Sequence, residues 1–251
     1  MNSPAPAQFV PRADDIYIVT YPRSGTSLVQ MILHQLRTDG SLSFGHISEV
    51  MPFIDHSLKK GESLEHLPSP RVFKTHLRYG YISRRPGKYI YVARDGRDVL
   101  ISYFHMYQTW VNPGILFPDF FADFLSGKVQ YGLWFRHVAE WESHREDPNV
   151  LFLRYEDLVG ALPSCVERIA RFLAWPIAPD AHRRIAERCG IEYMRKYEDK
   201  FAPELSPSVR RSIQSGSFIC RGVVGAWREK FTREQELAFD HALRQPAHRS
   251  T

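Results

Sequence analysis

The sequence is poor in cysteine and lacks the segments that direct a chain into or across a membrane. Its three cysteines, Cys165, Cys189 and Cys220, are spaced too widely for a C-x-x-C metal pair or a disulfide framework. Residues 1–12 have neither the basic nor the apolar region of a signal peptide, and no apolar run reaches membrane-spanning length. We therefore expect a soluble cytoplasmic protein in a reducing compartment.

Several common functional motifs are also missing. The chain has no G-x-x-x-x-G-K-[ST] phosphate loop, no H-E-x-x-H zinc motif and no G-x-S-x-G nucleophile elbow. These absences argue against an ordinary ATP or GTP P-loop and against an α/β-hydrolase nucleophile. The histidines of the chain are not spaced like the ligands of a metal site, so we expect no bound metal.

What the chain does contain is typical of one globular domain with a basic bias. Hydrophobic residues make up 43% and charged residues 24%, which excludes a disordered chain, a collagen and a coiled-coil rod. Lys plus Arg outnumber Asp plus Glu by 33 to 28 in 251 residues, and this net charge of +5 favours an anionic ligand. With no internal repeat and no linker, we expect residues 1–251 to form a single domain, with 1–13 and 246–251 as loose ends.

Three short apolar runs, each followed by a turn and a helical pattern, indicate the fold class. They are residues 16–19, 89–93 and 150–153, and the first is followed by a predicted helix from Ser27 to about Arg37. Continuous apolar strands that alternate with helices are typical of a parallel sheet covered on both faces. The sequence therefore predicts an α/β domain with a central, mainly parallel sheet, whose ligands collect at the carboxyl ends of the strands.

The first apolar run leads into a loop with the composition of an anion-binding turn. Residues 21–27 read YPRSGTS and join the strand to the helix. At such a junction, backbone N–H groups and the positive end of the helix dipole can surround an oxyanion, and Arg23 adds a full charge. Taken alone, the loop is compatible with an anion site and with a plain turn.

Polar residues near the other apolar segments favour the anion site. Lys74 and His76 follow the apolar pair 72–73, and on a strand their side chains point to the same face. Arg94 follows the second long run, and Ser102 lies eight residues later, near the start of the next helix. The sequence thus places cations, a hydroxyl and an imidazole at the predicted strand ends.

Each of these segments also has a purely structural interpretation. Residues 74–76 fit an exposed edge strand, and residues 94–98 fit a solvated turn with a helix cap. We assign Arg97 and Asp98 to the structure. His105 is flanked by aromatic residues and fits the wall of a pocket or a packed core equally well.

Together these blocks resemble the cytosolic sulfotransferases, which transfer a sulfuryl group from 3′-phosphoadenosine-5′-phosphosulfate (PAPS) to a hydroxyl or amine. The similar blocks are residues 16–27, 69–77, 91–99, 102–105, 132–134, 137–141, 155–158 and 221–227. The resemblance implies a P-loop-like loop that binds the phosphosulfate, PAPS as donor, 3′-phosphoadenosine-5′-phosphate (PAP) as product, and no metal.

The resemblance also implies a role for individual residues. His76 would be the general base, and Lys74 and Arg23 would stabilise the charge that builds on the leaving phosphate. The implied cofactor contacts are Arg23, Ser24, Gly25, Thr26 and Ser27 at the 5′-phosphosulfate, Arg94 and Ser102 at the 3′-phosphate, Tyr155 near the adenine, and Arg221 and Gly222 in a closing C-terminal segment.

The sequence departs from the family pattern in three places. Leu28 and Ile191 take the positions of aromatic residues that stack on the adenine. Cys220 takes the position of an arginine that precedes the C-terminal phosphate contact. Arg233 and Leu237 break the dimer motif of the family, so we do not predict the family dimer and leave the oligomeric state open.

We predict an enzyme that sulfates a hydroxyl or amine of a small or lipid-like acceptor, without a nucleic-acid partner and without stable membrane insertion. The alternatives are a P-loop kinase that uses a nucleoside triphosphate and a non-catalytic module that binds 3′-phosphoadenosine nucleotides. Residues 44–67, 107–121 and 201–217 are expected to wall the acceptor pocket. Their apolar members fit a pocket lining or ordinary core: Phe44, Met51, Phe53, Trp110, Phe117 and Phe120.

Overall fold

The apolar runs of the sequence form strands of one parallel sheet. The computed structural model describes residues 9–38, 40–178, 181–202, 219 and 222–245. Its four strands are β1 (Ile16–Thr20), β2 (Val72–Thr75), β3 (Lys88–Ala93) and β4 (Val150–Arg154). They lie in the order β2-β1-β3-β4, and every neighbouring pair is parallel. The predicted α/β architecture is confirmed, and β2 is an edge strand of the sheet.

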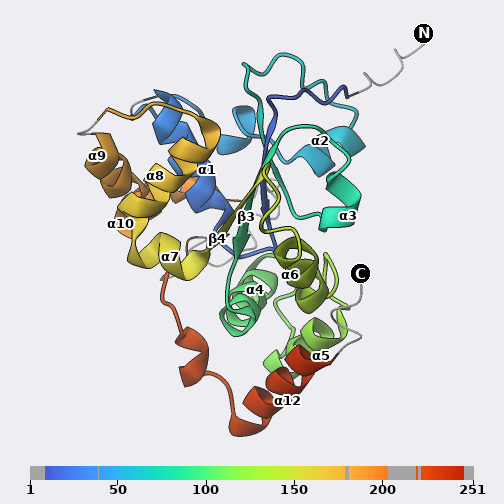
Figure 1. The fold of residues 1–251 in the computed structure, drawn as a ribbon. Helices are drawn as coiled ribbons and strands as arrows, with labels where there is room; N and C mark the ends of the chain where they lie inside the picture. Colours follow the sequence, from blue (N-terminus) through green and yellow to red (C-terminus); the bar gives the residue numbers. More distant parts are fainter. Residues whose placement is uncertain (1–8, 39, 179–180, 203–218, 220–221, 246–251) are drawn as a thin grey trace.

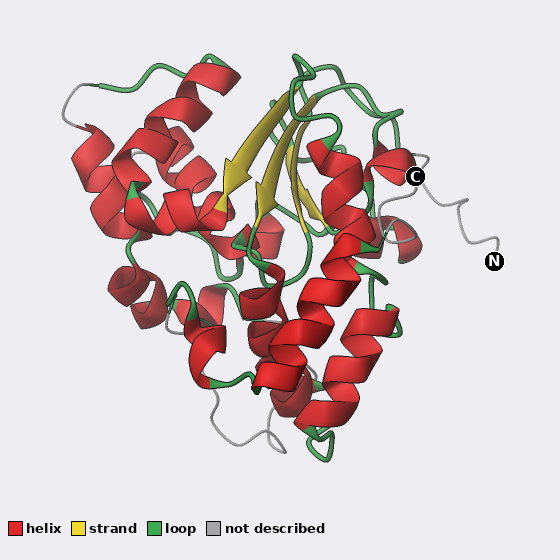
Figure 2. Cartoon of the chain, turned by 60° about the horizontal axis from the view of Figure 1, so that its bottom comes forward, coloured by secondary structure: helices red, strands yellow, loops and turns green. Residues whose placement is uncertain are grey.

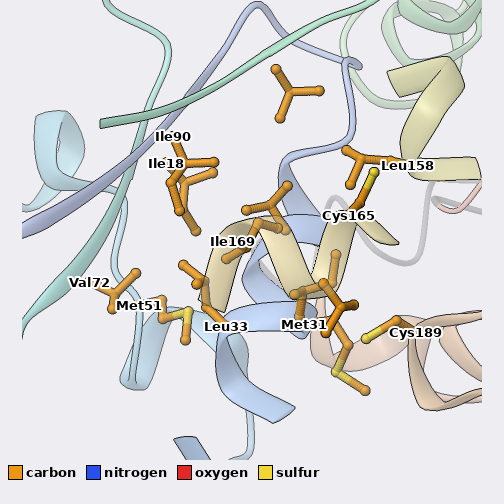
Figure 3. Close-up of a cluster of buried hydrophobic side chains, with 14 of the residues drawn as sticks. Ile18, Met31, Leu33, Met51, Val72, Ile90, Leu158, Cys165, Ile169 and Cys189 are labelled. Carbon is orange, nitrogen blue, oxygen red and sulfur yellow. The ribbon is translucent and has the colours of Figure 1, made fainter. Parts of the chain in front are cut away.

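Successive side chains of each strand pack on opposite faces, so both faces of the sheet are buried. On one face, Ile18 and Ile90 pack against α1 (Thr26–Thr38), α8 (Leu162–Leu173) and α9 (Ala181–Cys189). Figure 3 shows this cluster, with the strand residues above Leu33 of α1 and Ile169 of α8. The helix predicted after the first strand is α1, which begins one residue earlier than expected.

The other face of the sheet is aromatic. The Tyr17 ring stacks between those of Phe73 and Tyr89, with centroid distances of 5.7 and 5.1 Å. Trp141 of α6 (Trp134–Glu142) and Ile82 of α3 (Tyr79–Ile82) cover these rings, together with residues of α2 (Ile54–Lys59). The sheet therefore lies between two helical layers, as Figures 1 and 2 show.

A third group of helices lies beyond the carboxyl ends of the strands, at the bottom of Figure 1. It contains α4 (Gly96–Trp110), α5 (Phe117–Ser126) and α12 (Arg233–Arg244), which pack around Tyr103, Phe120 and Phe239. The remaining elements are α7 (Tyr155–Gly160), α10 (Ile191–Lys196) and the 3-10 helices η1 (Ile47–Glu49), η2 (Glu198–Lys200) and η3 (Ala226–Glu229).

The strand order determines where a ligand can bind. From β1 the chain passes to β2 on one side and then crosses to β3 on the other side of β1. In open parallel sheets, ligands bind outside the carboxyl ends of the strands, where the order reverses. The carboxyl end of β1 is that point in this protein.

Candidate active site

Residues that follow each of the four strands line one cavity. It lies where the strands end, which we call the carboxyl edge of the sheet. β1 leads into the loop of residues 21–25, β2 into His76, β3 into Arg94 and β4 into Tyr155. Residues from each of these four junctions line a cavity of about 1060 Å³. The fold thus brings together segments that are far apart in the sequence.

The loop after β1 has an unusual backbone conformation. Arg23 has a φ of 72° and Gly25 a φ of 99°, both in the left-handed region. A side chain at position 25 is also excluded by space, because a Cβ atom there would lie 2.8 Å from the Tyr155 ring. Gly25 therefore allows the loop to approach the junction of β4 and α7 closely.

The start of α1 completes this loop. The cavity is lined by four of the five loop residues that we predicted to bind phosphosulfate: Arg23, Gly25, Thr26 and Ser27. The first N–H groups of a helix have no acceptor within it, and the helix dipole is positive there. Ser24 differs, because its N–H donates to the Tyr21 carbonyl (3.2 Å) and its buried side chain does not line the cavity.

Two arginines and a serine meet beside this loop. Arg94 Nη1 donates to the carbonyl oxygen of Arg23 (2.8 Å), and Arg23 Nε donates to Ser102 Oγ (3.0 Å). The Arg94 guanidinium lies over the Tyr155 ring, 4.2 Å from its centroid. Arg94 Nε is buried without an acceptor among the described residues. Because an unpaired buried donor is costly, this corner of the cavity fits a bound anion.

His76 is oriented by hydrogen bonds to β1. Its Nδ1 lies 2.8 Å from the carbonyl oxygen of Thr20 and 3.2 Å from Thr20 Oγ1, which is 2.6 Å from Thr26 Oγ1. A carbonyl oxygen can only accept, so Nδ1 carries the proton and Nε2 of the neutral ring carries a lone pair. One chain of hydrogen bonds therefore links Thr26, at the start of α1, to the imidazole.

The surroundings keep this imidazole neutral. Loss of water around the ring, together with the positive charge of Lys74, lowers the pKa of His76 to about 3, although the hydrogen bond to Thr20 acts in the opposite direction. Two rings contribute to this exclusion of water, since Phe53 and Tyr131 pack edge-on against His76 with centroid distances of 5.1 and 5.0 Å. At neutral pH the His76 ring is thus uncharged, and its Nε2 carries a lone pair.

The space in front of His76 has aromatic walls. We call it the aromatic chamber, and it is formed by Phe53, Lys74, His76, Tyr103 and Tyr131. Lys74 Nζ lies over the Phe53 ring, 5.3 Å from its centroid, so its charge stays beside the imidazole. Tyr131 has a φ of 73°, an uncommon conformation that directs its ring toward His76.

Most of the apolar residues that the sequence suggested as a pocket lining lie outside the cavity. Of the six apolar residues singled out in the sequence, Phe53 lines the cavity. The others are not part of its wall: Phe44, Met51 and Phe120 are core residues, and Trp110 and Phe117 are half-buried outside it. His105 is exposed and fits neither of its two interpretations. Sequence reasoning missed Tyr103 and Tyr131, for which no local pattern gave a signal.

The opposite end of the cavity is largely aliphatic. Leu28 and Ile191, the residues that replace stacking aromatics, both line it beside Tyr155. Gly222 reaches this end with a φ of 67°, and a Cβ atom there would lie 3.4 Å from Ile191 Cδ1 and 3.7 Å from Tyr155 Oη. A flat ring at this end would therefore contact alkyl groups and one tyrosine.

Asp98 fixes the C-terminal segment that carries Gly222. Its carboxylate accepts hydrogen bonds from the backbone N–H groups of Gly225 (2.7 Å) and Trp227 (3.1 Å). The Arg97 guanidinium lies over the Trp227 ring, 4.6 Å from its centroid. Asp98 and Arg97 thus have the structural role that we assigned to them. Two residues of the predicted closing segment lie outside the described residues: Cys220 and Arg221.

Fold and cavity together define an α/β protein with a large cavity, lined in part by arginine and lysine, at the carboxyl edge of a parallel sheet. In the part of the chain that the structure describes, no cluster of three or more His, Cys, Asp or Glu side chains is arranged to hold a metal ion. None of the helices there combines the length and apolarity needed to cross a bilayer.

The chain belongs to the sulfotransferase family, since residues 13–251 match the family model of the sulfotransferase domain. Rabbit (Oryctolagus cuniculus) amine sulfotransferase is 32% identical over 249 residues, covering 93% of this chain and 81% of that protein. Human sulfotransferase 4A1 is 32% identical over 248 residues, covering 95% of this chain and 82% of that protein. The resemblance noted in the sequence is confirmed.

Solved structures of similar fold agree with this assignment. Retinol dehydratase in complex with androsterone and inactive cofactor PAP superimposes with a TM-score of 0.76 at 26% identity, covering 92% of this chain and 80% of that one. Mouse sulfotransferase SULT7A1 complexed with PAP gives a TM-score of 0.75 at 30% identity, covering 93% of this chain and 84% of that one.

Proposed function

We propose that this enzyme transfers the sulfuryl group of PAPS to a hydroxyl or amine of a small or lipid-like acceptor, with His76 as the general base. The observation that carries the proposal is a neutral imidazole between the phosphate-binding loop and the aromatic chamber. The complexes of both structural relatives with PAP, and of one with androsterone, support the donor and the kind of acceptor.

The residues of the cavity fit PAPS. The loop around Gly25 and the start of α1 would hold the 5′-phosphosulfate, and Arg94 and Ser102 the 3′-phosphate. The buried Arg94 Nε supports this assignment, because a phosphate would supply the acceptor that it lacks within the described chain. The adenosine would lie against Leu28, Tyr155, Ile191 and Gly222.

When bound, PAPS supplies a sulfuryl group that is activated by its phosphate leaving group. His76 Nε2 accepts the proton of the acceptor while the acceptor atom bonds to sulfur and the bond from sulfur to the phosphate oxygen breaks. Lys74 and Arg23 provide the positive charge that stabilises the departing phosphate, as cationic groups do in phosphoryl transfer. Ser24 stabilises the turn of the loop.

The aromatic chamber favours an acceptor with an apolar body. Beyond the rings of Phe53 and Tyr131, the wall continues with Leu64, Leu67 and Met106. These side chains can pack against the apolar part of an acceptor, and the single hydroxyl or amine of that acceptor would then face His76.

The proposal is tested by turnover of radiolabelled PAPS with a panel of alcohols, phenols, amines and saccharides. The His76→Ala variant should lose about 10²- to 10⁴-fold in rate, because a positioned general base contributes that much. It should keep the PAP affinity of the unchanged protein. The control is His105→Ala, at an exposed histidine outside the cavity, which should leave turnover unchanged.

Two results would contradict the proposal. One is transfer by His76→Ala at the rate of the unchanged protein. The other is transfer to no member of the panel. Labelled ATP in place of PAPS tests the kinase alternative in the same assay, and we expect no phosphoryl transfer.

A further inference from the structure

Tyr91 and His137 form a buried polar pair behind the active site. Both side chains are 0% exposed. Tyr91 lies on β3 and His137 on α6, and the Tyr91 hydroxyl is 3.1 Å from His137 Nδ1. The other ring nitrogen, Nε2, is 3.2 Å from the backbone carbonyl oxygen of His76. A line of hydrogen bonds therefore runs from β3 through α6 to the backbone of His76.

The partners of His137 determine which of its ring nitrogens carries the proton. The carbonyl of His76 can only accept, so Nε2 must be the donor. The neutral ring then has its lone pair on Nδ1, which accepts the hydrogen bond from the Tyr91 hydroxyl. With the proton on Nδ1 instead, Nε2 would present a lone pair to the carbonyl oxygen. The carbonyl of His76 thus selects this tautomer, and the Tyr91 hydroxyl holds the ring in place by donating to the Nδ1 lone pair.

Packing keeps this pair in place. The Tyr91 ring stacks on Trp141 with a centroid distance of 5.0 Å and an interplanar angle of 10°. The Tyr21 ring lies edge-on to His137 at 5.4 Å, and its hydroxyl donates to the carbonyl oxygen of Gly132 (2.7 Å). Neither side chain can move without disturbing the aromatic face of the sheet.

His76 needs such support because it lies just beyond the end of the sheet. The register between β1 and β2 ends at the pair Val19 and Thr75, so the carbonyl of His76 is outside the parallel ladder. His137 supplies the hydrogen bond that the ladder no longer provides. Thr20 holds the imidazole ring and His137 holds the backbone, so His76 is fixed at two points.

We propose that Tyr91 and His137 are positioning residues for sulfuryl transfer, in which Tyr91 holds the His137 ring so that its Nε2–H fixes the backbone of His76. The proposal rests on the general-base role of His76. We call the hydrogen bonds from Tyr91 through His137 to His76 the relay. When the relay is broken, the His76 backbone can rotate, and Nε2 of His76 moves away from the hydroxyl or amine of the acceptor. A displacement of about 1 Å in a reacting group can cost on the order of 10²-fold in rate.

The first test compares Tyr91→Phe with Tyr89→Phe. Tyr89 is a matched control, because it is a buried tyrosine of the same strand whose hydroxyl bonds to the carbonyls of Arg85 (2.5 Å) and Ile82 (2.9 Å), away from His76. Kinetics are measured with labelled PAPS and 4-nitrophenol. Tyr91→Phe should lower kcat by about 10- to 100-fold while KM and the Kd of PAP stay within about threefold. Tyr89→Phe should keep kcat.

A second pair of variants tests His137 itself. The amide nitrogen of His137→Gln can occupy the place of Nε2 and donate to the His76 carbonyl, whereas the shorter side chain of His137→Asn cannot reach it. We therefore expect His137→Gln to keep most of kcat and His137→Asn to lose about as much as Tyr91→Phe. Equal activity of the Gln and Asn variants would overturn the relay.

Nitrogen NMR of histidine-labelled protein needs no acceptor and separates this proposal from the general-base role. In the unchanged protein, His137 should carry its proton on Nε2 and His76 on Nδ1, and Tyr91→Phe should shift the Nδ1 signal of His137, which loses its hydrogen-bond donor. A proton on Nδ1 of His137 in the unchanged protein, or an unchanged Nδ1 signal in Tyr91→Phe together with full kcat, would overturn the relay while the His76→Ala result still stands. If neither the unchanged protein nor any variant transfers the sulfuryl group, the proposed function is contradicted instead.

Discussion

The amino and carboxyl edges of the sheet, where the strands begin and end, each have an arginine, but only the one at the amino edge is fully buried and fully paired. At the amino edge, Arg71 is 0% exposed, donates twice to Asp15 at 2.8 Å, and also bonds to Glu65 (2.7 Å) and to the carbonyl of Val10 (2.8 Å). At the carboxyl edge, Arg94 bonds to one carbonyl, and its buried Nε has no acceptor among the described residues.

The difference separates a structural arginine from a ligand-binding one. The charge of Arg71 is neutralised within the protein, so it requires no further anion, and removing it would leave the buried Asp15 without its ion-pair partner. The charge of Arg94 faces a cavity, and its donors are only partly used. Substitution of the first should therefore affect folding, and substitution of the second should affect binding.

The largest effect is expected at the amino edge. Arg71→Leu should lower the free energy of unfolding by about 3–5 kcal/mol, because breaking a buried ion pair leaves an uncompensated charge. Urea unfolding measures this loss. The folded fraction should bind PAP with the affinity of the unchanged protein. A large loss of PAP affinity in that fraction would contradict a role of Arg71 in folding alone.

The matching change at the carboxyl edge is Arg94→Ala. It should weaken PAP binding by about 10- to 150-fold, since hydrogen bonds to charged groups are worth about 1.5–3 kcal/mol. Isothermal titration measures the affinity, and urea unfolding should show stability near that of the unchanged protein. Unchanged PAP affinity would remove Arg94 from the proposed site.

The carboxyl edge should also be sensitive to acid, because His137 is buried there as a neutral ring. Burial lowers the pKa of His137 to about 3, so between this value and about 6.5 the unfolded chain binds a proton that the folded chain does not. Stability then falls as the pH decreases, and His137 contributes about 2 kcal/mol of loss between pH 7 and pH 5. Urea unfolding at both pH values should show a smaller loss for His137→Gln, and an equal loss would place the acid sensitivity elsewhere.

The smallest effect concerns the aliphatic end of the cavity. Leu28→Trp would present an aromatic face to the adenine and should tighten PAP binding by about 2- to 10-fold, since an aromatic pair adds about 0.5–1.5 kcal/mol. The same titration measures the change. Weaker binding would mean that the alkyl groups of Leu28 and Ile191 are adapted to the base and that a larger ring does not fit.

The parts of this protein that could be predicted from sequence depend on local patterns. One contiguous stretch contains the apolar run before residue 21, the loop around Gly25 and the helix after it. This stretch predicted a strand-loop-helix junction and an anion site. Lys74 and His76 were predicted for the same reason, because Lys74 lies on β2 and His76 directly after its end, and both line the cavity.

The parts that could not be predicted depend on contacts between distant segments. Nothing near Tyr131 in the sequence shows that its ring packs against His76, and nothing near His137 shows that its acceptor is the backbone of another histidine. The apolar residues of the acceptor segments failed as predictors because the hydrophobic effect buries a core residue and a pocket residue alike. Only packing decided that Phe53 lines the cavity and Phe120 does not.

The most direct test of the difference between the edges is a crystal structure of the protein with PAP. We predict the 3′-phosphate within hydrogen-bond distance of Arg94 Nε and Ser102, and the 5′-phosphate at the loop around Gly25, with the pairing of Arg71 unchanged. PAP bound away from the carboxyl edge, or bound there with Arg94 Nε still lacking an acceptor, would contradict the assignment of this edge as the donor site.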